Sequence, residues 1–434
     1  MLLLPWLHAL DMAASWPRAL GLGILMAMAF TAAVFPWFGE AIGQATQWGS
    51  AAGVALLVLA GPLFQAQFLV FALLRWWFRR TLGPVLAALA GACAWVATET
   101  LAPKLLGDTL GHGLYPSVLL RQAADLGGAA GLTLLLLLVH EALLAAWRAR
   151  RQGLAAVARP LAAAAAVPLA LAAYGLATPN AQVAAGTPTL RVAMVQSAIV
   201  DYERLRREKG TAAVVREVPD VHYAMTHDAV ERQQAQAVLW SETVYPTTFA
   251  QPKSQAGAEL DREIVGIVNA AGVPFVFGTY DRDGAGEYNA AAFVAPGRGL
   301  VGFYRKTHPF PLTEWVPSWL DSPGLRQALP WLGSWRPGNG ARVLPLFLAD
   351  GREVPVLPLI CLDAVHPSLA LDGARLGAQV ILSLSNDSWF TNAPQGAALH
   401  LVVAAFRSIE TRRPRFRVTS DATSAVTDVD GTVL

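Results

Sequence analysis

The sequence predicts an α-helical transmembrane bundle followed by a globular α/β domain, and three observations support this fold class. Of the 434 residues, 54% are hydrophobic and only 15% are charged, whereas soluble domains have about 25% charged residues. The apolar excess is confined to residues 1–177, while residues 189–434 have the charge and turn content of a globular domain. In that second part strand-like and helical segments alternate, which is typical of a layered α/β fold.

Five apolar runs in the first part are long enough, at about 17 to 25 residues, to cross a bilayer. They are residues 19–38, 51–74, 81–101, 128–147 and 160–177. Residues 1–14 are interpreted as an interfacial segment or a truncated span, because they lack the basic region and cleavage site of a removable signal peptide. Residues 178–188, rich in Pro, Ala and Gly, are the predicted linker.

Lys and Arg in the short loops predict the orientation of the bundle. The basic loops are residues 75–80 and 148–151, and the opposite loops are poor in Lys and Arg. Alternating the five runs puts both basic loops on the cytoplasmic side. The globular domain, residues 189–434, is therefore predicted to be extracytoplasmic.

Composition and spacing exclude several classes of partner. A net charge of +2 and the lack of a basic tract with interleaved aromatic residues argue against nucleic acid. The histidines do not fall at a metal-binding spacing, so neither a metal nor a cofactor is predicted. The basic run at residues 412–415 is interpreted as a solvated face, with contact to anionic lipid headgroups as the alternative.

Strands and helices can be assigned along the globular part. The predicted strands are residues 190–196, 237–240, 274–280, 289–294, 300–304, 356–360, 379–383, 416–419 and 425–428, and the predicted helices are 221–234, 257–271, 367–376 and 397–410.

Three of these strands end in chemically active side chains, namely Glu242, Lys306 and Cys361. The only other cysteine, Cys93, lies in an apolar run, so Cys361 is predicted to be a free thiol. A carboxylate can take the thiol proton as general base, and a nearby ammonium group can lower the thiol pKa and stabilise an oxyanion. Each residue alone also has an ordinary explanation: a buried core thiol, a helix cap, or a solvated lysine. Their joint placement at strand ends favours catalysis.

Several sequence blocks resemble a known superfamily. Trp-Ser-Glu-Thr at 240–243, Tyr-Arg-Lys-Thr-His at 304–308 and Ile-Cys-Leu-Asp at 360–363 look like the three catalytic blocks of the nitrilase, or carbon–nitrogen hydrolase, superfamily. The resemblance narrows to its membrane branch, apolipoprotein N-acyltransferase. Supporting blocks lie at residues 122–128, 310–317, 385–390 and 407–414, and the second of these carries an additional active-site glutamate, Glu314.

The resemblance implies a four-layer α-β-β-α sandwich and a Glu-Lys-Cys triad. The implied reaction moves a fatty acyl chain from a phospholipid, through a Cys361 thioester, to the N-terminal α-amino group of a lipidated bacterial lipoprotein. The implied location is the bacterial inner membrane, with the catalytic domain on the periplasmic side. We expect four further residues to lie around the triad and hold it in position, namely Leu362, Asp363, His308 and Trp315.

Two departures from the family pattern keep other functions open. The branch usually has Tyr-Glu after the cysteine, where this chain has Leu362 and Asp363, so we expect a supporting hydrogen bond to be lost or moved. The family also has a further membrane helix after the domain, whereas this sequence stops at Leu434. The alternatives are a divergent paralogue, a membrane-tethered amidase that uses water as acceptor, or a non-catalytic scaffold.

Overall fold

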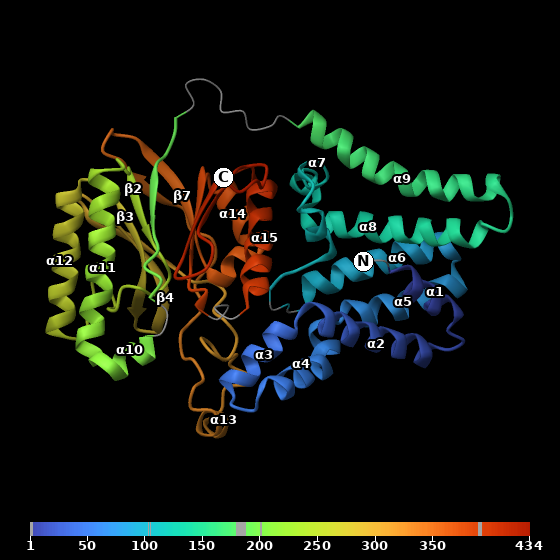
Figure 1. Cartoon of the computed structure of the whole chain (residues 1–434), viewed down its shortest axis with the longest axis horizontal. Coiled ribbons are helices and arrows are strands. Elements are labelled where there is room, and N and C mark those ends of the chain that lie inside the picture. Colours follow the sequence, from blue (N-terminus) through green and yellow to red (C-terminus); the bar gives the residue numbers. More distant parts are fainter. Residues whose placement is uncertain (1–2, 103, 105, 179–187, 200–201, 389–392) are drawn as a thin grey trace. The chain divides into compact units, whose positions relative to one another are not determined.

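The computed structural model describes residues 3–102, 104, 106–178, 188–199, 202–388 and 393–434. The chain forms two compact units, Met1–Asn180 and Ala181–Leu434, each with its own hydrophobic core (Figure 1). Residues 179–187 of the predicted linker lie outside the described residues.

The first unit is entirely helical in its described residues. Its elements are α1 (Leu4–Met12), α2 (Trp16–Val34), α3 (Pro36–Ala45), α4 (Ser50–Phe64), α5 (Gln67–Thr81), α6 (Pro84–Leu101), the 3₁₀ helix η1 (Leu110–Leu114), α7 (Val118–Arg121), α8 (Ala124–Ala149) and α9 (Leu154–Ala177).

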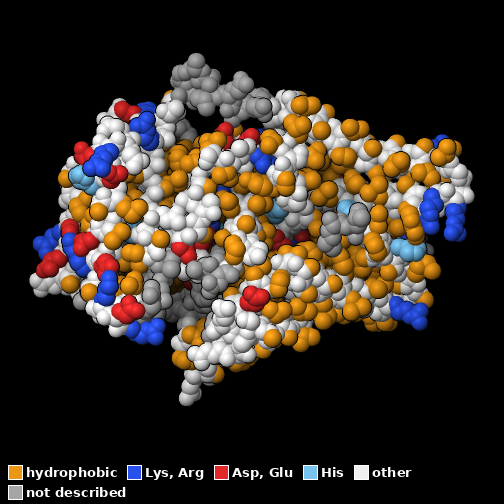
Figure 2. Space-filling model, in the orientation of Figure 1, with side chains coloured by type: hydrophobic (Ala, Val, Ile, Leu, Met, Phe, Trp, Pro, Cys, Tyr) orange, Lys and Arg blue, Asp and Glu red, His pale blue; other side chains and the backbone are white. Residues whose placement is uncertain are grey.

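Four helices in the described part of this unit, α2, α6, α8 and α9, are long and apolar enough to cross a membrane, and α4 and α5 qualify together as one bent pair. Hydrophobic side chains cover much of the visible surface over these helices (Figure 2). Leu63, Leu101 and Leu154 are among the large exposed hydrophobic residues. An apolar exterior is unfavourable in water and suits lipid. The predicted membrane character is therefore confirmed.

Two of the predicted apolar runs are not single straight helices. The run at 51–74 is divided at Gln65 and Ala66 into α4 and α5, which meet at an angle of 44°. Pro62 lies within the last turn of α4, and proline removes a backbone hydrogen bond and bends a helix. The run at 19–38 ends at Val34, and Pro36 opens the separate helix α3.

The N-terminal helix α1 is packed inside the helical unit. Trp6, Leu7 and Leu10 are buried, and the ring of Trp6 stacks on Phe71 of α5 with centroids 5.3 Å apart. The described part of residues 1–14 thus forms a nine-residue helix with several apolar side chains packed on other helices, while Met12 is exposed.

Asp11 of α1 links the two basic segments of the bundle, and residues 75–80, predicted to be a loop, form the last turns of α5. Its carboxylate pairs with Arg75 at 2.7 Å and Arg79 at 2.9 Å, near the end of α5, and also with Arg148 at the end of α8. Both basic segments therefore lie at the same end of the helical unit.

In its described residues the second unit contains two five-stranded sheets. The first has the order β1-β2-β3-β4-β5 and the second β10-β9-β8-β7-β6. The strands are β1 (Val192–Val195), β2 (Ala237–Trp240), β3 (Phe275–Asp283), β4 (Gly286–Ala295), β5 (Gly299–Arg305), β6 (Leu344–Phe347), β7 (Glu353–Ile360), β8 (Val380–Ser385), β9 (Arg415–Thr419) and β10 (Ala425–Thr427).

The helical elements of this unit are α10 (Tyr202–Lys209), α11 (Thr211–Glu231), α12 (Gln255–Ala271), α13 (Pro323–Ala328), the 3₁₀ helix η2 (Cys361–Val365), α14 (Pro367–Arg375) and α15 (Pro394–Thr411).

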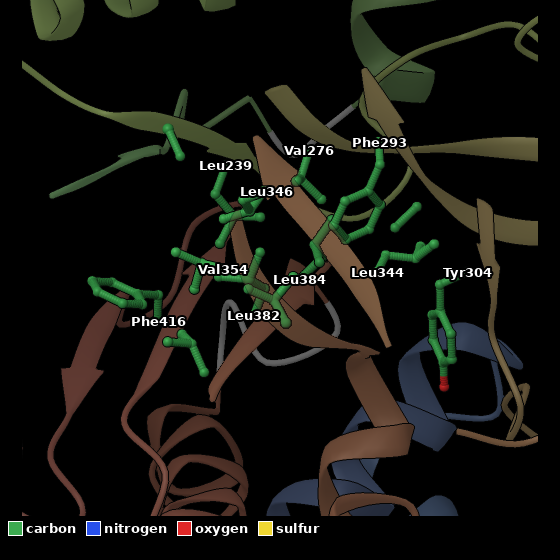
Figure 3. Close-up of a cluster of buried hydrophobic side chains, with 14 of the residues drawn as sticks. Leu239, Val276, Phe293, Tyr304, Leu344, Leu346, Val354, Leu382, Leu384 and Phe416 are labelled. Carbon is green, nitrogen blue, oxygen red and sulfur yellow. The ribbon is translucent and has the colours of Figure 1, made fainter. Parts of the chain in front are cut away.

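The two sheets pack face to face and are covered by helices on both outer sides. Side chains from both sheets fill the space between them, including Leu239 and Phe293 from one and Leu382 from the other (Figure 3). Ile264 of α12 packs on the outer face of the first sheet, and Leu369 of α14 on that of the second. The predicted α-β-β-α sandwich is confirmed.

Strand directions explain why the predicted active side chains share an edge. β2 is parallel to β3, and β3, β4 and β5 pair antiparallel in turn, so β5 runs in the same direction as β2. Glu242 after β2 and Lys306 after β5 therefore follow the carboxyl ends of strands at one edge of the sheet.

One sequence interpretation is wrong in the second sheet. Arg415, from the basic run predicted to be a solvated face, is fully buried. It begins β9, which lies between β8 and β10, and it donates to Thr427 Oγ1 at 3.2 Å. A central strand has no solvent face, because helices or the other sheet cover both of its sides.

Candidate active site

Glu242 is held by donors on both carboxylate oxygens. Oε1 accepts hydrogen bonds from Lys306 Nζ at 2.8 Å and from Asn289 Nδ2 at 2.7 Å. Oε2 accepts from the backbone N–H of Asn386 at 2.7 Å. Asn386 follows β8 of the second sheet, so this carboxylate connects the two sheets at their shared edge.

Gly278 of β3 lets the backbone beside Glu242 approach closely. A Cβ atom at position 278 would lie 2.4 Å from the nitrogen of Thr243 and 2.6 Å from Cα of Glu242, which is too close for any side chain. Thr243 itself has a left-handed φ of 53°. The chain therefore turns sharply after Glu242 and leaves the carboxylate facing inward.

Lys306 lies between two carboxylates. Its ammonium group is 2.8 Å from Glu242 and 2.9 Å from Glu314, and only 1% of its side chain is exposed. Its backbone N–H donates to the carbonyl of Asn289 at 2.8 Å, and its carbonyl accepts from Gly338 at 2.7 Å. These main-chain bonds fix the direction of the lysine side chain.

Glu314 comes from the segment after Lys306 and is the more exposed of the two carboxylates, with 17% of its side chain accessible. Oε2 accepts the backbone N–H of Phe310 at 2.7 Å. The next residue, Trp315, closes the same turn, because its N–H donates to the carbonyl of Phe310 at 3.3 Å and its carbonyl accepts from Leu312 at 2.7 Å. Trp315 thus contributes its backbone to the placement of Glu314.

Cys361 is the first residue after β7 and has a left-handed φ of 49°. Residues other than glycine rarely adopt this conformation, and it is common at functional sites. The same residue begins η2, whose backbone N–H groups follow directly. The turn therefore places a thiol next to potential oxyanion donors.

Burial and charge determine the protonation of this cluster. Burial raises the pKa of the Cys361 thiol far above its ordinary value, even though the ammonium group of Lys306 opposes this. Burial also raises the pKa of Glu242, again against the effect of Lys306. Burial lowers the pKa of Lys306, but Glu242, Cys361 and Glu314 outweigh it and the pKa rises well above the usual value. The resting site therefore holds a thiol beside an ammonium–carboxylate pair.

Asp363 is fully buried and accepts several hydrogen bonds. Oδ2 accepts from the Tyr304 hydroxyl at 2.8 Å and from the N–H groups of Thr307 and Ile360, both at 3.3 Å. Oδ1 accepts the His308 N–H at 2.7 Å and lies 3.2 Å from His308 Nδ1. This short acid connects the segment after Lys306 with the turn at Cys361.

The two other predicted supporting residues lie beside Asp363. The ring of His308 stacks on His366, with centroids 3.7 Å apart. Burial and the neighbouring His308 lower the pKa of His366 to about 4, so His366 is neutral at neutral pH. Leu362 is buried in a small apolar cluster with Val365 and Val403, where a hydroxyl group would have no place.

Sequence reasoning missed two groups that hold Glu242. Asn289 stands at the start of the otherwise apolar segment 289–294, and a polar residue there was an available signal. The backbone N–H of Asn386 has no sequence signal. In the described part of the chain no group of three or more His, Cys, Asp or Glu side chains is placed to hold a metal ion.

Two family models match this chain and show which class of protein it belongs to. The model of the carbon–nitrogen hydrolase family matches residues 178–434, and the chain belongs to that family. Residues 1–142 match the model of the apolipoprotein N-acyltransferase N-terminal domain. The two matches together confirm the predicted membrane branch.

Curated relatives are named apolipoprotein N-acyltransferase. The protein from Rhizobium rhizogenes is 28% identical over 96% of this chain and 77% of its own length. The one from Caulobacter vibrioides is 29% identical over 92% and 73%. The one from Chlorobaculum tepidum is 26% identical over 56% of this chain and 48% of its own length. The chain thus spans about half the length of the last relative.

Solved structures of the superfamily are similar at low identity. A carbon–nitrogen hydrolase from Helicobacter pylori is 14% identical, with a TM-score of 0.38 over 51% of this chain and 79% of its own. A nitrilase-superfamily amidase from Nesterenkonia is 17% identical, with a TM-score of 0.38 over 56% and 85%.

Proposed function

We propose that this chain transfers a fatty acyl group from a phospholipid to the N-terminal α-amino group of a lipidated bacterial lipoprotein, through a thioester on Cys361. The observation that carries the proposal is the cluster of Glu242, Lys306 and Glu314, whose charges act on the Cys361 thiol. The names of the relatives and the apolar helical unit support a lipid substrate.

Charge balance assigns the proton acceptor. Two carboxylates and one ammonium group already give the cluster a net charge of −1, so a thiolate would add a second uncompensated negative charge in a buried site. The Cys361 proton therefore moves to a carboxylate as the sulfur attacks. Glu242 is the acceptor, because burial raises its pKa and its side chain is the more buried of the two.

The first half-reaction forms the thioester. The sulfur of Cys361 bonds to the ester carbonyl of the phospholipid, and the carbonyl oxygen becomes an oxyanion stabilised by Lys306 and the N–H of Leu362. Collapse of the intermediate breaks the ester C–O bond. Glu242 returns its proton to the departing lysophospholipid alkoxide.

The second half-reaction regenerates the thiol. The neutral α-amino group of the acceptor attacks the thioester carbonyl, and Glu242 takes a proton from the attacking nitrogen. Breaking the C–S bond releases the amide, and Glu242 protonates the sulfur of Cys361. Glu314 accepts a hydrogen bond from the ammonium group of Lys306 and keeps it in place.

We also propose the membrane location and orientation. Asp11 gathers both basic segments at one end of the helical unit, and that end belongs on the cytoplasmic side by the positive-inside rule. The last spanning helix, α9, starts near the basic loop at 148–151 and ends at Ala177. The chain therefore leaves the membrane on the opposite, periplasmic side of the bacterial inner membrane, where lipoprotein acceptors are anchored.

The test is an acyl-enzyme assay with purified full-length protein in phospholipid micelles. We expect a fatty acyl adduct on Cys361 that hydroxylamine releases and that an added diacylated lipopeptide discharges as an amide. Cys361→Ala should abolish the adduct, while Cys93→Ala, which removes the only other thiol, should retain it. An adduct that persists in Cys361→Ala would refute the proposal. Lipid-independent release of ammonia from small amides would instead indicate an amidase, and a Cys361 inert to every acyl donor would indicate a scaffold.

A further inference from the structure

A buried histidine on α15 contacts the backbone of Cys361. His400 of α15 is 2% exposed, and its Nε2 lies 3.3 Å from the carbonyl oxygen of Cys361. The carbonyl belongs to the residue with the left-handed φ. This contact therefore acts on the one backbone position that sets the direction of the thiol.

The neighbours of His400 determine which ring nitrogen carries the proton. Arg417 Nη2 lies 3.2 Å from His400 Nδ1, and a guanidinium group can only donate. The carboxylate of Asp387 is 3.6 Å from the same nitrogen, beyond hydrogen-bond distance. Nδ1 therefore accepts from Arg417, which leaves the proton on Nε2 to donate to the Cys361 carbonyl.

Arg417 is itself held in one orientation. Nη2 donates to Asp387 Oδ2 at 2.6 Å, and Nη1 donates to the carbonyl of Thr423 at 2.7 Å. Both Arg417 and Asp387 are fully buried, so solvent does not compete for these bonds. The network Asp387–Arg417–His400 is thus a rigid support that ends at the carbonyl of Cys361.

We propose that His400 is a positioning residue that holds Cys361 in its left-handed turn, with Arg417 and Asp387 fixing the ring. The proposal rests on the proposed function in one respect, that Cys361 is the reacting group. Without the Nε2 donor, the peptide after Cys361 can rotate toward an ordinary conformation. The thiol then turns away from Lys306 and Glu242, and misplacement of a reacting atom by about 1 Å lowers rates about 100-fold.

The test compares two substitutions in a Cys93→Ala background, so that Cys361 is the only thiol. His400→Ala removes the donor, and His400→Gln keeps a side-chain N–H at a similar distance from the backbone. The matched control is His222→Ala, because His222 is also buried and bonds a backbone carbonyl, that of Val218 within α11, while its ring packs on Trp240. Alkylation of Cys361 by iodoacetamide, followed by intact mass, is measured together with the kcat and KM of acyl transfer.

We expect His400→Ala to slow both alkylation and kcat by about 10- to 100-fold with KM unchanged, in the range for a misplaced reacting group. His400→Gln should recover most of the rate, and His222→Ala should leave both rates near the parent. Wild-type rates in His400→Ala, or an equal loss in His400→Gln, would overturn the proposal. If His400→Ala does not fold, the alkylation rate and kcat of His400→Gln and Arg417→Lys are used to test the proposal. Parent-like rates in Arg417→Lys would overturn the role of Arg417.

The alkylation arm contains no lipid, so it separates this proposal from the proposed function. Slow alkylation in His400→Ala alongside a parent protein that transfers no acyl group would support the positioning role and refute acyl transfer. Unchanged alkylation in His400→Ala, alongside a parent protein that does transfer acyl groups, would refute the positioning role and support acyl transfer.

Discussion

Each unit buries a cation between two carboxylates, Arg75 in the helical unit and Lys306 in the sandwich, but only Lys306 also acts on a thiol. In the helical unit Arg75 is 1% exposed and pairs with Asp11 and, through two nitrogens, with Glu141. In the sandwich Lys306 is equally buried between Glu242 and Glu314. A buried cation with two acids is therefore not by itself a sign of catalysis.

The difference lies in what surrounds each cation. Arg75 has a planar group that forms fixed bonds and keeps its charge at any ordinary pH, and its acids link α5 to α1 and α8. Lys306 carries a compact charge that acts on a thiol at a left-handed turn. The first cluster joins helices, whereas the second lies beside a thiol, where the proposed reaction needs a proton acceptor and a cation.

The largest expected effect is the loss of the proton acceptor. Glu242→Gln keeps the shape of the side chain but cannot take the thiol proton, so we expect acyl-enzyme formation to slow by about 10³-fold, within the range for general acid–base catalysis. Single-turnover acylation with labelled phospholipid measures the rate. The matched change Glu141→Gln in the helical unit should leave that rate unchanged. A fall of less than tenfold in Glu242→Gln would contradict the assignment of the base.

Replacing Lys306 by the kind of cation found in the helical unit tests whether the shape of the charged group matters. Lys306→Arg keeps the positive charge but spreads it over a larger planar group, which does not fit between Glu242 and Glu314 while also facing a developing oxyanion. We expect about a 10²-fold lower kcat, similar to the loss of one oxyanion donor. Steady-state kinetics measures it, with Arg305→Lys, one residue earlier, as control. Full activity in Lys306→Arg would show that charge alone suffices.

The sequence predicted the parts of the site that follow from strand direction. Glu242 and Lys306 each follow a strand and so were expected at one sheet edge, and Cys361 likewise ends a buried apolar strand. Glu314 was predicted only through the resemblance, because nothing in the spacing of 306 and 314 indicates that both side chains meet at one ammonium group.

Contacts between distant segments could not be predicted. Tyr304 packs its ring in the core between the sheets (Figure 3). Its hydroxyl donates to Asp363 of η2, which follows β7 of the other sheet. Arginine is usually exposed, and the burial of Arg417 beside His400 depends on a contact between β9 and α15 that the sequence does not indicate. The helix α10 and the short strand β6, with Pro345 at its centre, were missed because each is brief and lacks a clear periodicity.

The cation of the helical unit should matter for stability and not for rate. Arg75→Met leaves the buried carboxylate of Glu141 without its partner, and breaking a buried ion pair in this way destabilises by about 3 to 5 kcal/mol. Thermal unfolding in detergent should show a lower midpoint for the helical unit, while the alkylation rate of Cys361 in the folded fraction stays at the parent value. Arg79→Met, which removes a more exposed arginine, is the milder control. A parent-like midpoint in Arg75→Met would mean that the helical cluster is not structural.

The smallest expected effect concerns a carboxylate that acts only through other residues. Asp363→Asn keeps the size of the side chain but replaces one acceptor oxygen with an NH₂ donor. That donor would lie against the Tyr304 hydroxyl or the His308 N–H, which donate to Asp363 in the parent protein. The segment carrying Lys306 should shift slightly against the Cys361 turn, and we expect about a tenfold lower kcat, below the loss for a fully misplaced group. Asp261→Asn is the matched control, because Asp261 also accepts a tyrosine hydroxyl, that of Tyr245 at 3.1 Å, but lies on α12 away from the thiol. If both variants lose activity equally, the effect comes from general destabilisation of the sandwich; if only Asp363→Asn does, the carboxylate aligns the two catalytic segments.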